Sequence, residues 1–188
     1  MKLIGLTGPA GSGKDTVGSL LSGLHNFDKF ALADPIRFAI MGMFGASYAE
    51  MNDRLLKESV IDWIGKSPRQ LMQTLGTEWG RQHVASDIWL RIAERKIETL
   101  RAANSIDDHP IAGIVITDIR FDNEADWLRK LGGSVWHIHR PNASGPIGES
   151  ARHISEAGVA MQAGDLKINN TASFDALATL AEEALEQC

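Results

Sequence analysis

The chain has 188 residues, 44% of them hydrophobic and 23% charged, which is ordinary for one globular domain with a sizeable core. Its formal net charge of −5 argues against a surface built for long nucleic acid, although a few arginines in one cleft suffice for a small anion. No apolar run approaches the roughly 20 residues that span a bilayer, and the single cysteine, Cys188, excludes an internal disulfide. We therefore expect a cytoplasmic protein without a membrane partner.

Apolar patterning predicts strands and helices from the first residues onward. A short apolar run at 2–7 ends in a glycine loop and predicts a buried strand. The segment after the loop has apolar residues at helical spacing, namely Val17, Leu20, Leu21 and Leu24. Residues 27–33 can form a second short strand, and Pro35 opens a predicted helix that ends at Phe44.

The stretch from 50 to 100 is predicted to be helical. Ser67 and Pro68 form an N-cap and first-turn pair, and Ser86 with Asp87 gives a second start signal. The inner faces of these two helices are predicted to carry Leu71, Leu75 and Trp79 in the first, and Trp89, Ala93, Ile97 and Leu100 in the second. A polar loop is expected at 104–110.

The second half of the chain continues the alternation. Residues 111–117 predict a buried strand that ends in Asp118, and Asp122 can cap the helix that follows, which Gly132 and Gly133 end. Strands are expected at 134–139 and 166–169. The inner faces of the two helices are predicted to carry Ala125, Leu128 and Leu131, and then Phe174, Leu177, Ala181 and Leu185 after a Ser173 cap.

Strands that alternate with helices predict an α/β fold with a parallel sheet flanked by helices. Ligands of such sheets bind beyond the carboxyl ends of the strands, where Thr7, Asp118 and His139 are expected. Residues 140–158 are rich in Pro, Gly, Ser and charge, and we interpret them as a mobile lid. The whole chain, 1–188, is read as one domain.

The glycine loop is the strongest motif. It fits G-x-x-x-x-G-K between a strand and an amphipathic helix, and predicts a site for the phosphates of a nucleoside triphosphate. Glycines let the backbone curl until successive N–H groups point at an anion, and the helix adds its positive end. Lys14 then supplies a charge near the β- and γ-phosphates. The loop residues are Gly8, Pro9, Ala10, Gly11, Ser12, Gly13, Lys14, Asp15 and Thr16.

Magnesium is harder to place, because Asp15 stands where a hydroxyl usually helps to hold the ion. Thr16 is expected to contact the α-phosphate, and Asp15 can hold Mg²⁺ through water or simply cap the helix. Asp118 can orient Mg²⁺ or its water, or can be a loop-capping residue. Arg120 can hold a substrate phosphate or pair with a carboxylate.

For other charged residues the sequence gives a less specific functional interpretation. Arg69 and Arg81 bracket a segment of amides, hydroxyls and glycines, which favours a ligand-facing surface over a solvated helix face. Arg140 and Arg152 suit a closing lid that brings charge to a phosphoryl group, and an exposed basic loop is the alternative. His137 and His139 alternate on a strand, but without a third ligand at a telling spacing a metal site is disfavoured.

At this point the motifs resemble those of the bacteriophage-type deoxynucleoside monophosphate kinases of the P-loop kinase superfamily. The resemblance covers most of the chain, and the 73–81 and 118–125 segments, QTLGTEWGR and DIRFDNEA, are its most particular parts. These two parts belong to longer matching segments, SPRQLMQTLGTEWGR at 67–81 and ITDIRFDNEADWLRKLGG at 116–133. The other matching segments are GPAGSGKDT at 8–16, ALADPIR at 31–37, HRP at 139–141, RHISE at 152–156 and INNTASFDAL at 168–177.

The resemblance implies phosphoryl transfer from ATP with Mg²⁺ to a deoxynucleoside monophosphate. It implies a helical acceptor-binding insertion at about 34–100, and Lys14, Arg140 and Arg152 as the catalytic charges. Asn169, Asn170 and Thr171 would lie beside the adenine. The monophosphate site would be lined by Asp34, Arg37, Arg69, Gln73, Thr77, Glu78, Arg81 and Arg120. If a phage encodes the chain, the host cytoplasm is its expected location.

Two alternatives stay open. One is a P-loop kinase for another small acceptor, such as dephosphocoenzyme A or phosphomevalonate. The other is a nucleotide-binding module without turnover, although the guanine-reading N-K-x-D segment typical of nucleotide switches is missing. The preferred base and the existence of a homodimer are not indicated by the sequence.

Overall fold

The computed structural model describes residues 1–141, 143, 158–171 and 173–188. The interior of the predicted lid, with Arg152 and His153, lies outside these residues. Across the described ranges, none of the helices combines the length and apolar character needed to cross a membrane.

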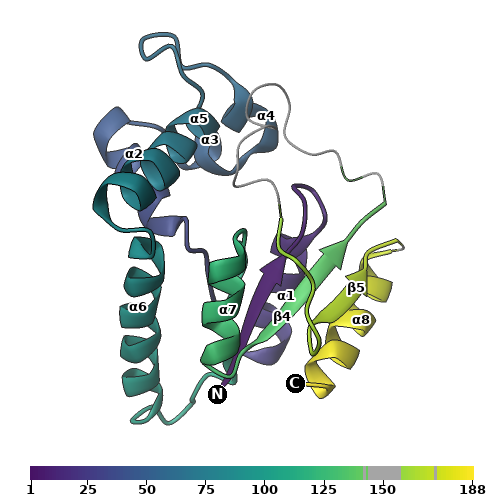
Figure 1. Cartoon of the computed structure of the whole chain (residues 1–188). Coiled ribbons are helices and arrows are strands. Elements are labelled where there is room, and N and C mark those ends of the chain that lie inside the picture. Colours follow the sequence, from purple (N-terminus) through teal and green to yellow (C-terminus); the bar gives the residue numbers. More distant parts are fainter. Residues whose placement is uncertain (142, 144–157, 172) are drawn as a thin grey trace.

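A five-stranded parallel sheet forms the centre of the molecule (Figure 1), which confirms the predicted α/β class. The strand order is β2-β3-β1-β4-β5, so all carboxyl ends lie along one edge. The bounds are β1 Lys2–Thr7, β2 Phe27–Phe30, β3 Gly113–Ile116, β4 Ser134–His139 and β5 Leu166–Asn169. β2 and β3 are shorter than predicted, because the chain already turns toward the next element after Phe30 and pairs only from Gly113.

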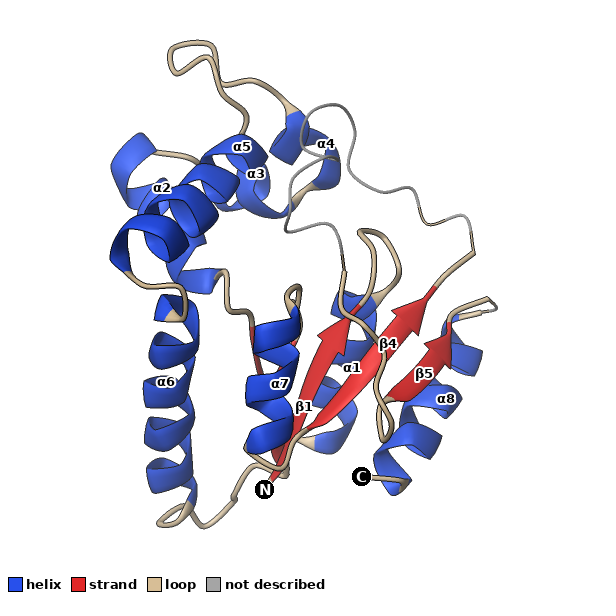
Figure 2. Ribbon diagram, in the orientation of Figure 1, coloured by secondary structure: helices blue, strands red, loops and turns tan. Residues whose placement is uncertain are grey.

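Two pairs of helices cover the sheet (Figure 2). α1 (Lys14–His25) and α8 (Phe174–Glu186) share one core cluster, which includes Leu21, Trp136 and Leu177. α6 (Ile88–Asn104) and α7 (Asp122–Lys130) share the other cluster, which includes Ile97 and Leu128. These apolar faces agree with the predicted ones except at helix ends, where Leu24 and Phe174 are 64% and 60% exposed.

A helical subdomain lies beyond the carboxyl edge of the sheet (Figure 1). Its elements are α2 Asp34–Phe44, α3 Tyr48–Asn52, α4 Arg54–Glu58, α5 Pro68–Gln73 and η1 Thr74–Val84. They enclose a separate core of Ile36, Ile40, Ala46, Met51 and Trp89. The predicted continuous helical stretch is wrong at 59–67, where the chain leaves α4 and Ile61 pairs with Lys66 in an isolated antiparallel bridge.

α5 begins as predicted, since Ser67 and Gln70 form a reciprocal capping box. It then widens into a π-helix, η1, whose bonds run five residues apart, as from the Ala85 N–H to the Gly80 carbonyl at 3.0 Å. The wider turn rotates side chains away from the pattern of an α-helix. Trp79 is therefore 50% exposed, and its predicted place on the buried face is wrong.

Glycines take the inner face of η1 because Trp89 of α6 lies directly against it. The Trp89 indole N–H donates to the Gly76 carbonyl at 2.7 Å. A Cβ added at Gly80 would lie 2.4 Å from the Trp89 ring. The glycines thus allow η1 and α6 to approach closely, which fixes η1 above the sheet edge.

The start of α7 also differs from the prediction. Asp122 does not cap it, since its carboxylate accepts from the Ala160 N–H at 2.9 Å. Glu124 instead reaches back to the N–H groups of Arg120 and Phe121, at 2.7 and 3.1 Å. The predicted Ser173 cap of α8 is confirmed, by a hydrogen bond from the Ala176 N–H at 3.3 Å.

Candidate functional site

The glycine loop arches between β1 and α1. Gly8, Gly11 and Gly13 have φ angles of 139°, 78° and 104°, which L-residues with side chains rarely adopt. The ammonium group of Lys14 donates across the arch to the carbonyls of Gly8 and Pro9, at 2.7 and 2.8 Å. Lys14 therefore closes the loop on itself, and the role of the loop as a triphosphate site stays a prediction.

Asn170, which follows β5, closes the loop from the side. Its amide donates to the Ser12 carbonyl at 2.9 Å, and its backbone N–H donates to the His139 carbonyl at 2.7 Å. A Cβ at Gly13 would lie 2.5 Å from that amide. Asn170 thus supports the loop directly, whereas Asn169 and Thr171 are exposed beside it.

Asp118 is buried where β3 ends. Its two carboxylate oxygens accept from the N–H groups of Leu32 and Ala33, at 2.6 and 3.0 Å. Burial raises its pKa, although Arg37, Arg120 and the two N–H groups oppose the rise. The geometry gives Asp118 the loop-anchoring role that the sequence offered as an alternative, and its magnesium role stays a prediction.

The part of the chain that the structure describes contains no cluster of metal-ligating side chains. Within the described ranges, no three His, Cys, Asp or Glu side chains gather in a way that could hold an ion. Asp15 lies exposed in the first turn of α1, next to half-buried Thr16. Nε2 of His137 forms a hydrogen bond with Oδ2 of Asp165 at 2.9 Å, and His139 is exposed.

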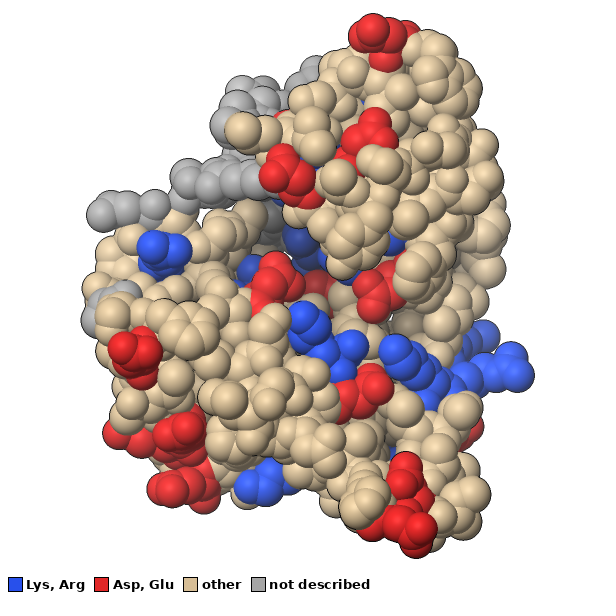
Figure 3. Space-filling model, turned by 180° about the vertical axis from the view of Figure 1, so that it is seen from behind, with Lys and Arg blue, Asp and Glu red and all other residues tan. Residues whose placement is uncertain are grey.

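A second site lies between the helical subdomain and the sheet edge. We call it the cationic pocket; its cavity volume is about 90 Å³, and it opens to solvent. Seen from behind, basic and acidic side chains gather in the hollow between these two parts of the molecule (Figure 3). The pocket brings together six of the eight predicted acceptor residues, namely Arg37, Arg69, Gln73, Thr77, Arg81 and Arg120.

The other two predicted acceptor residues are not in its lining. Asp34 accepts from the Ala31 N–H at 2.8 Å and pairs with Arg37 at 2.6 Å, so it orients an arginine that is in the lining. Glu78 is exposed on η1.

Carboxylates from neighbouring elements hold the arginines of the pocket. Glu58 of α4 pairs with Arg69 of α5. Glu124 of α7 pairs with Arg81 of η1, whose guanidinium lies 3.8 Å from the centre of the Phe121 ring. Burial raises the pKa of Glu124, although the N–H groups of Arg120 and Phe121 and the charge of Arg81 lower it.

The sequence did not single out Lys57, Glu58, Phe121 or Glu124 as pocket residues. Lys57 of α4 lines the pocket, and burial lowers its pKa to about 7, with further lowering by Arg37, Arg69 and Arg120 and an opposing effect of Asp118. No motif marks Lys57 in the sequence. Lys57 comes close to Arg37, Arg69 and Arg120 only because the chain folds.

Arg120 lies between the two sites. It lines the cationic pocket and also a second hollow whose lining includes Thr7, Gly8 and Pro9 at the start of the glycine loop. The glycine loop and the cationic pocket therefore adjoin at the carboxyl edge of the sheet. Arg140 is exposed just after β4.

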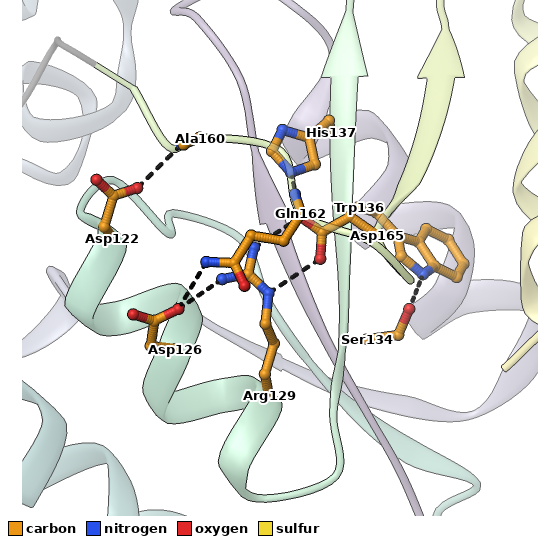
Figure 4. A network of polar contacts seen from close by, with 9 residues as sticks. All are labelled: Asp122, Asp126, Arg129, Ser134, Trp136, His137, Ala160, Gln162 and Asp165. Atoms are coloured by element: carbon orange, nitrogen blue, oxygen red, sulfur yellow. Dashed lines mark hydrogen bonds and ion pairs between the residues drawn. The ribbon is translucent and has the colours of Figure 1, made fainter.

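A polar network ties the arm at 158–165 to the sheet and α7 (Figure 4). Asp165 accepts two bonds from Arg129 of α7, at 3.0 and 2.6 Å, one from the Gln162 N–H at 2.9 Å, and contacts His137 of β4. Arg129 also donates to Asp126 at 2.8 Å. The arm continues into β5 and Asn170, so this network supports the glycine loop from a distance.

Comparison with known proteins agrees with this geometry. A family model described as deoxynucleotide monophosphate kinase matches residues 57–180. A putative deoxynucleotide monophosphate kinase of Acanthamoeba polyphaga mimivirus is 35% identical over 147 residues, which is 75% of each chain. The deoxynucleotide monophosphate kinase of Enterobacteria phage T4 is 26% identical over 249 aligned positions, with 99% of both chains covered. Among solved structures, TT1252 from Thermus thermophilus shares the fold with a TM-score of 0.55 at 19% identity, over 99% of this chain and 97% of that one.

Proposed function

Because the chain belongs to the deoxynucleotide monophosphate kinase family, we propose that it transfers the γ-phosphoryl group of ATP to a deoxynucleoside monophosphate, giving ADP and the deoxynucleoside diphosphate. The observation that carries this proposal is that Arg120 lines both the hollow at the glycine loop and the cationic pocket. A donor phosphate and an acceptor phosphate bound on its two sides would face one another, which is the arrangement that phosphoryl transfer requires.

On the donor side, the loop from Gly8 to Thr16 binds the ATP phosphates. Its glycines let backbone N–H groups converge on an anion, and α1 adds its positive N-terminal end. When ATP binds, the Lys14 ammonium group gives up its hydrogen bonds to the carbonyls of Gly8 and Pro9 and binds the β- and γ-phosphates instead. Asn169, Asn170 and Thr171 would flank the adenine, with Asn170 also holding the loop.

On the acceptor side, the cationic pocket binds the monophosphate. Arg37, Arg69 and Arg120 bind its phosphate group, because guanidinium forks match pairs of phosphate oxygens. The apolar wall of Ile36, Met72 and Trp89 suits the base. Gln73 and Thr77 supply the amide and hydroxyl groups that can hydrogen-bond base or sugar.

The transfer step needs alignment and charge more than covalent chemistry. The acceptor phosphate is already an anion, so no general base is required. Lys14 and Arg120 stabilise the charge that develops on the moving phosphoryl group. Arg140 and Arg152, as lid arginines, would add charge when the lid closes and excludes water that would otherwise hydrolyse ATP.

The residues at the glycine loop fit the way in which Mg²⁺ usually binds together with a nucleotide. Mg²⁺ keeps several waters and takes one or two carboxylates plus substrate phosphates, so a three-carboxylate cluster is not needed. Asp15, exposed beside the loop, would hold the ion through water. Bound there, the ion would supply positive charge to the ATP phosphates.

An assay of ADP release over the four deoxynucleoside monophosphates tests the proposal. The same assay should include dephosphocoenzyme A and phosphomevalonate as acceptors. We expect turnover with at least one deoxynucleoside monophosphate and none with the other two acceptors. Turnover with only dephosphocoenzyme A or phosphomevalonate would replace the proposed acceptor, and ATP binding without any turnover would favour a non-catalytic module.

A further inference from the structure

Basic side chains outnumber acidic ones in the lining of the cationic pocket. The basic side chains are those of Arg37, Lys57, Arg69, Arg81 and Arg120, and the carboxylates are those of Asp118 and Glu124. Asp34 pairs with Arg37 and Glu58 with Arg69, but no carboxylate within the described ranges forms an ion pair with Lys57. Such an arrangement suits an anion that arrives from outside the protein.

A second observation points the same way. The Nε atom of Arg37 is buried and has no hydrogen-bond partner among the described residues. A buried guanidinium donor without an acceptor is costly, so a bound oxygen that accepts from it would relieve the cost. Among the described residues, the Nε atom of Arg37 and the ammonium group of Lys57 therefore lack the acceptor that a phosphate would supply, although Nη1 of Arg37 is paired with Asp34.

We propose that Lys57 binds the phosphate group of the acceptor, and that it makes the pocket select a doubly charged phosphate monoester over an uncharged nucleoside. This inference rests on the proposed function for the identity of the acceptor, but its chemistry requires only a phosphorylated one. Neither the glycine-loop motif nor the segment from 67 to 81 indicates this role, because α4 lies outside both.

α4 is held in a way that positions Lys57 in advance. At its start, Asp53 accepts from the N–H groups of Leu55 and Leu56, at 2.8 and 2.9 Å. At its end, Glu58 is paired with Arg69 of α5. These anchors fix the backbone that carries Lys57, so only the lysine side chain has to be ordered when it binds a phosphate oxygen.

The charges around Lys57 predict how its binding depends on pH. The charged groups that act on it are Arg37 from α2, Arg69 from α5, and Asp118 and Arg120 from the chain after β3. Arg81 and Glu124 also line the pocket and pair with each other. Burial and the arginines lower the pKa of Lys57 to about 7, so above that pH the empty pocket contains a neutral lysine. A phosphate dianion, which forms above a pKa of about 6, favours the charged lysine, so binding draws a proton onto it.

The test measures dissociation constants without ATP, by titration calorimetry, for the preferred deoxynucleoside monophosphate and its deoxynucleoside. The variants are Lys57→Met and Lys57→Arg, with Lys66→Met as the control, because the Lys66 side chain is exposed on the neighbouring loop. We expect Lys57→Met to weaken binding of the monophosphate by about 10- to 100-fold and to leave deoxynucleoside and ATP binding within about 2-fold. Lys66→Met should bind like the wild type.

The arginine variant separates a phosphate ligand from a packing residue. Wild-type affinity for the monophosphate should fall as pH rises from 7 to 9, and Lys57→Arg should retain affinity at pH 7 and lose that fall, because arginine stays charged. The proposal is overturned if Lys57→Met leaves monophosphate affinity unchanged, if it weakens nucleoside binding equally, or if Lys57→Arg keeps the wild-type pH profile.

Failure of the proposed function would look different. If deoxynucleoside monophosphates do not bind the wild type but another phosphorylated acceptor does, the same Lys57 comparison is made with that acceptor. A charge-dependent loss there would support the role of Lys57 while rejecting the acceptor named above. If no phosphorylated acceptor binds the wild type, both proposals are overturned.

Discussion

The glycine loop and the cationic pocket are two anion sites at one edge of the same sheet, and they are built in opposite ways. The loop is one short segment whose donors are backbone groups, closed internally by Lys14 and supported by Asn170. The pocket is assembled from residues on six helices, α2, α4, α5, η1, α6 and α7, and on the chain after β2 and after β3. A site of the first kind is specified locally, whereas a site of the second kind exists only when the helical subdomain is docked.

This difference predicts that the two sites fail separately. A substitution in the loop should reduce the chemical step and leave acceptor binding intact. A substitution in the pocket or its supports should weaken acceptor binding and leave ATP binding intact. The predictions that follow test this separation, from the largest expected effect to the smallest.

The largest effect is expected for Lys14→Ala. The variant loses the positive charge of the loop, and loss of one such stabiliser commonly lowers kcat by roughly 10²–10³-fold. The carbonyls of Gly8 and Pro9 are exposed or only partly buried, so the fold should survive. Steady-state kinetics and a thermal melt check both points. A kcat near that of the wild type would contradict the role given to the loop.

Arg81→Lys should act on the other site. The planar guanidinium both pairs with Glu124 and stacks on Phe121, and a lysine cannot do the two together. We expect KM for the monophosphate to rise by about 10-fold, which corresponds to the loss of one charged hydrogen bond. KM for ATP should stay near that of the wild type in initial-rate kinetics.

The control is Arg91→Lys, since Arg91 is exposed on α6 and pairs with Asp87 one turn away. It should leave both KM values unchanged. If Arg81→Lys raises KM for ATP as strongly as KM for the monophosphate, the two sites are not separable in the way that their construction implies.

Gly80→Ala tests whether docking of η1 maintains the pocket. Its new Cβ would lie 2.4 Å from the Trp89 ring, and overpacking of this kind typically destabilises by about 1–3 kcal/mol. We expect a lower melting temperature and a several-fold higher KM for the monophosphate. Gly42→Ala is the matched control, because a Cβ on that residue of α2 meets no atom within 4 Å, and alanine favours a helix. Equal melting temperatures for the two variants would rule out the steric explanation.

The contrast between a site built from one local segment and a site assembled from distant segments also explains what the sequence predicted well. Strands 134–139 and 166–169 and the glycine loop follow from local patterns, and the structure has them as predicted. The pairing of Arg69 with Glu58 and of Arg81 with Glu124 could not be predicted, because each joins residues on different helices. Trp79 was misplaced because an α-helical period was applied to a π-helix, which no residue preference signals clearly.

The roles of two charged residues, Lys57 and Asp118, could not be predicted from the sequence either. A lysine between Leu56 and Glu58 in a five-residue helix looks like a surface residue until the helix is docked. Asp118 could be read as a magnesium ligand or as an anchor, and only the positions of the Leu32 and Ala33 N–H groups favour the second reading. Long-range contacts, which a periodicity argument does not contain, decide both cases.

The smallest effect is expected for Asp165→Asn, which tests the support of the glycine loop from the arm at 158–165. Burial alone would raise the pKa of Asp165, but the hydrogen bonds from Arg129, the Gln162 N–H and His137 outweigh it and hold the pKa below its usual range. A carboxyl group whose pKa is lower in the folded state stabilises the fold above its unfolded pKa of about 3.9, and this contribution is lost as pH falls through the folded value. We therefore expect the variant to be less stable by about 1 kcal/mol at pH 7, with a difference that is constant above about pH 5 and shrinks below about pH 4.

Thermal melts of both proteins from pH 3 to pH 7 measure this difference. Asp175→Asn serves as the control, because Asp175 is an exposed carboxylate in the first turn of α8. Since the arm leads through β5 to Asn170, Asp165→Asn should also raise KM for ATP slightly, while KM for the monophosphate stays unchanged. A stability difference that grows toward acid pH would reverse the sign argued here. A larger change in KM for the monophosphate than for ATP would show that the arm supports the cationic pocket instead of the glycine loop.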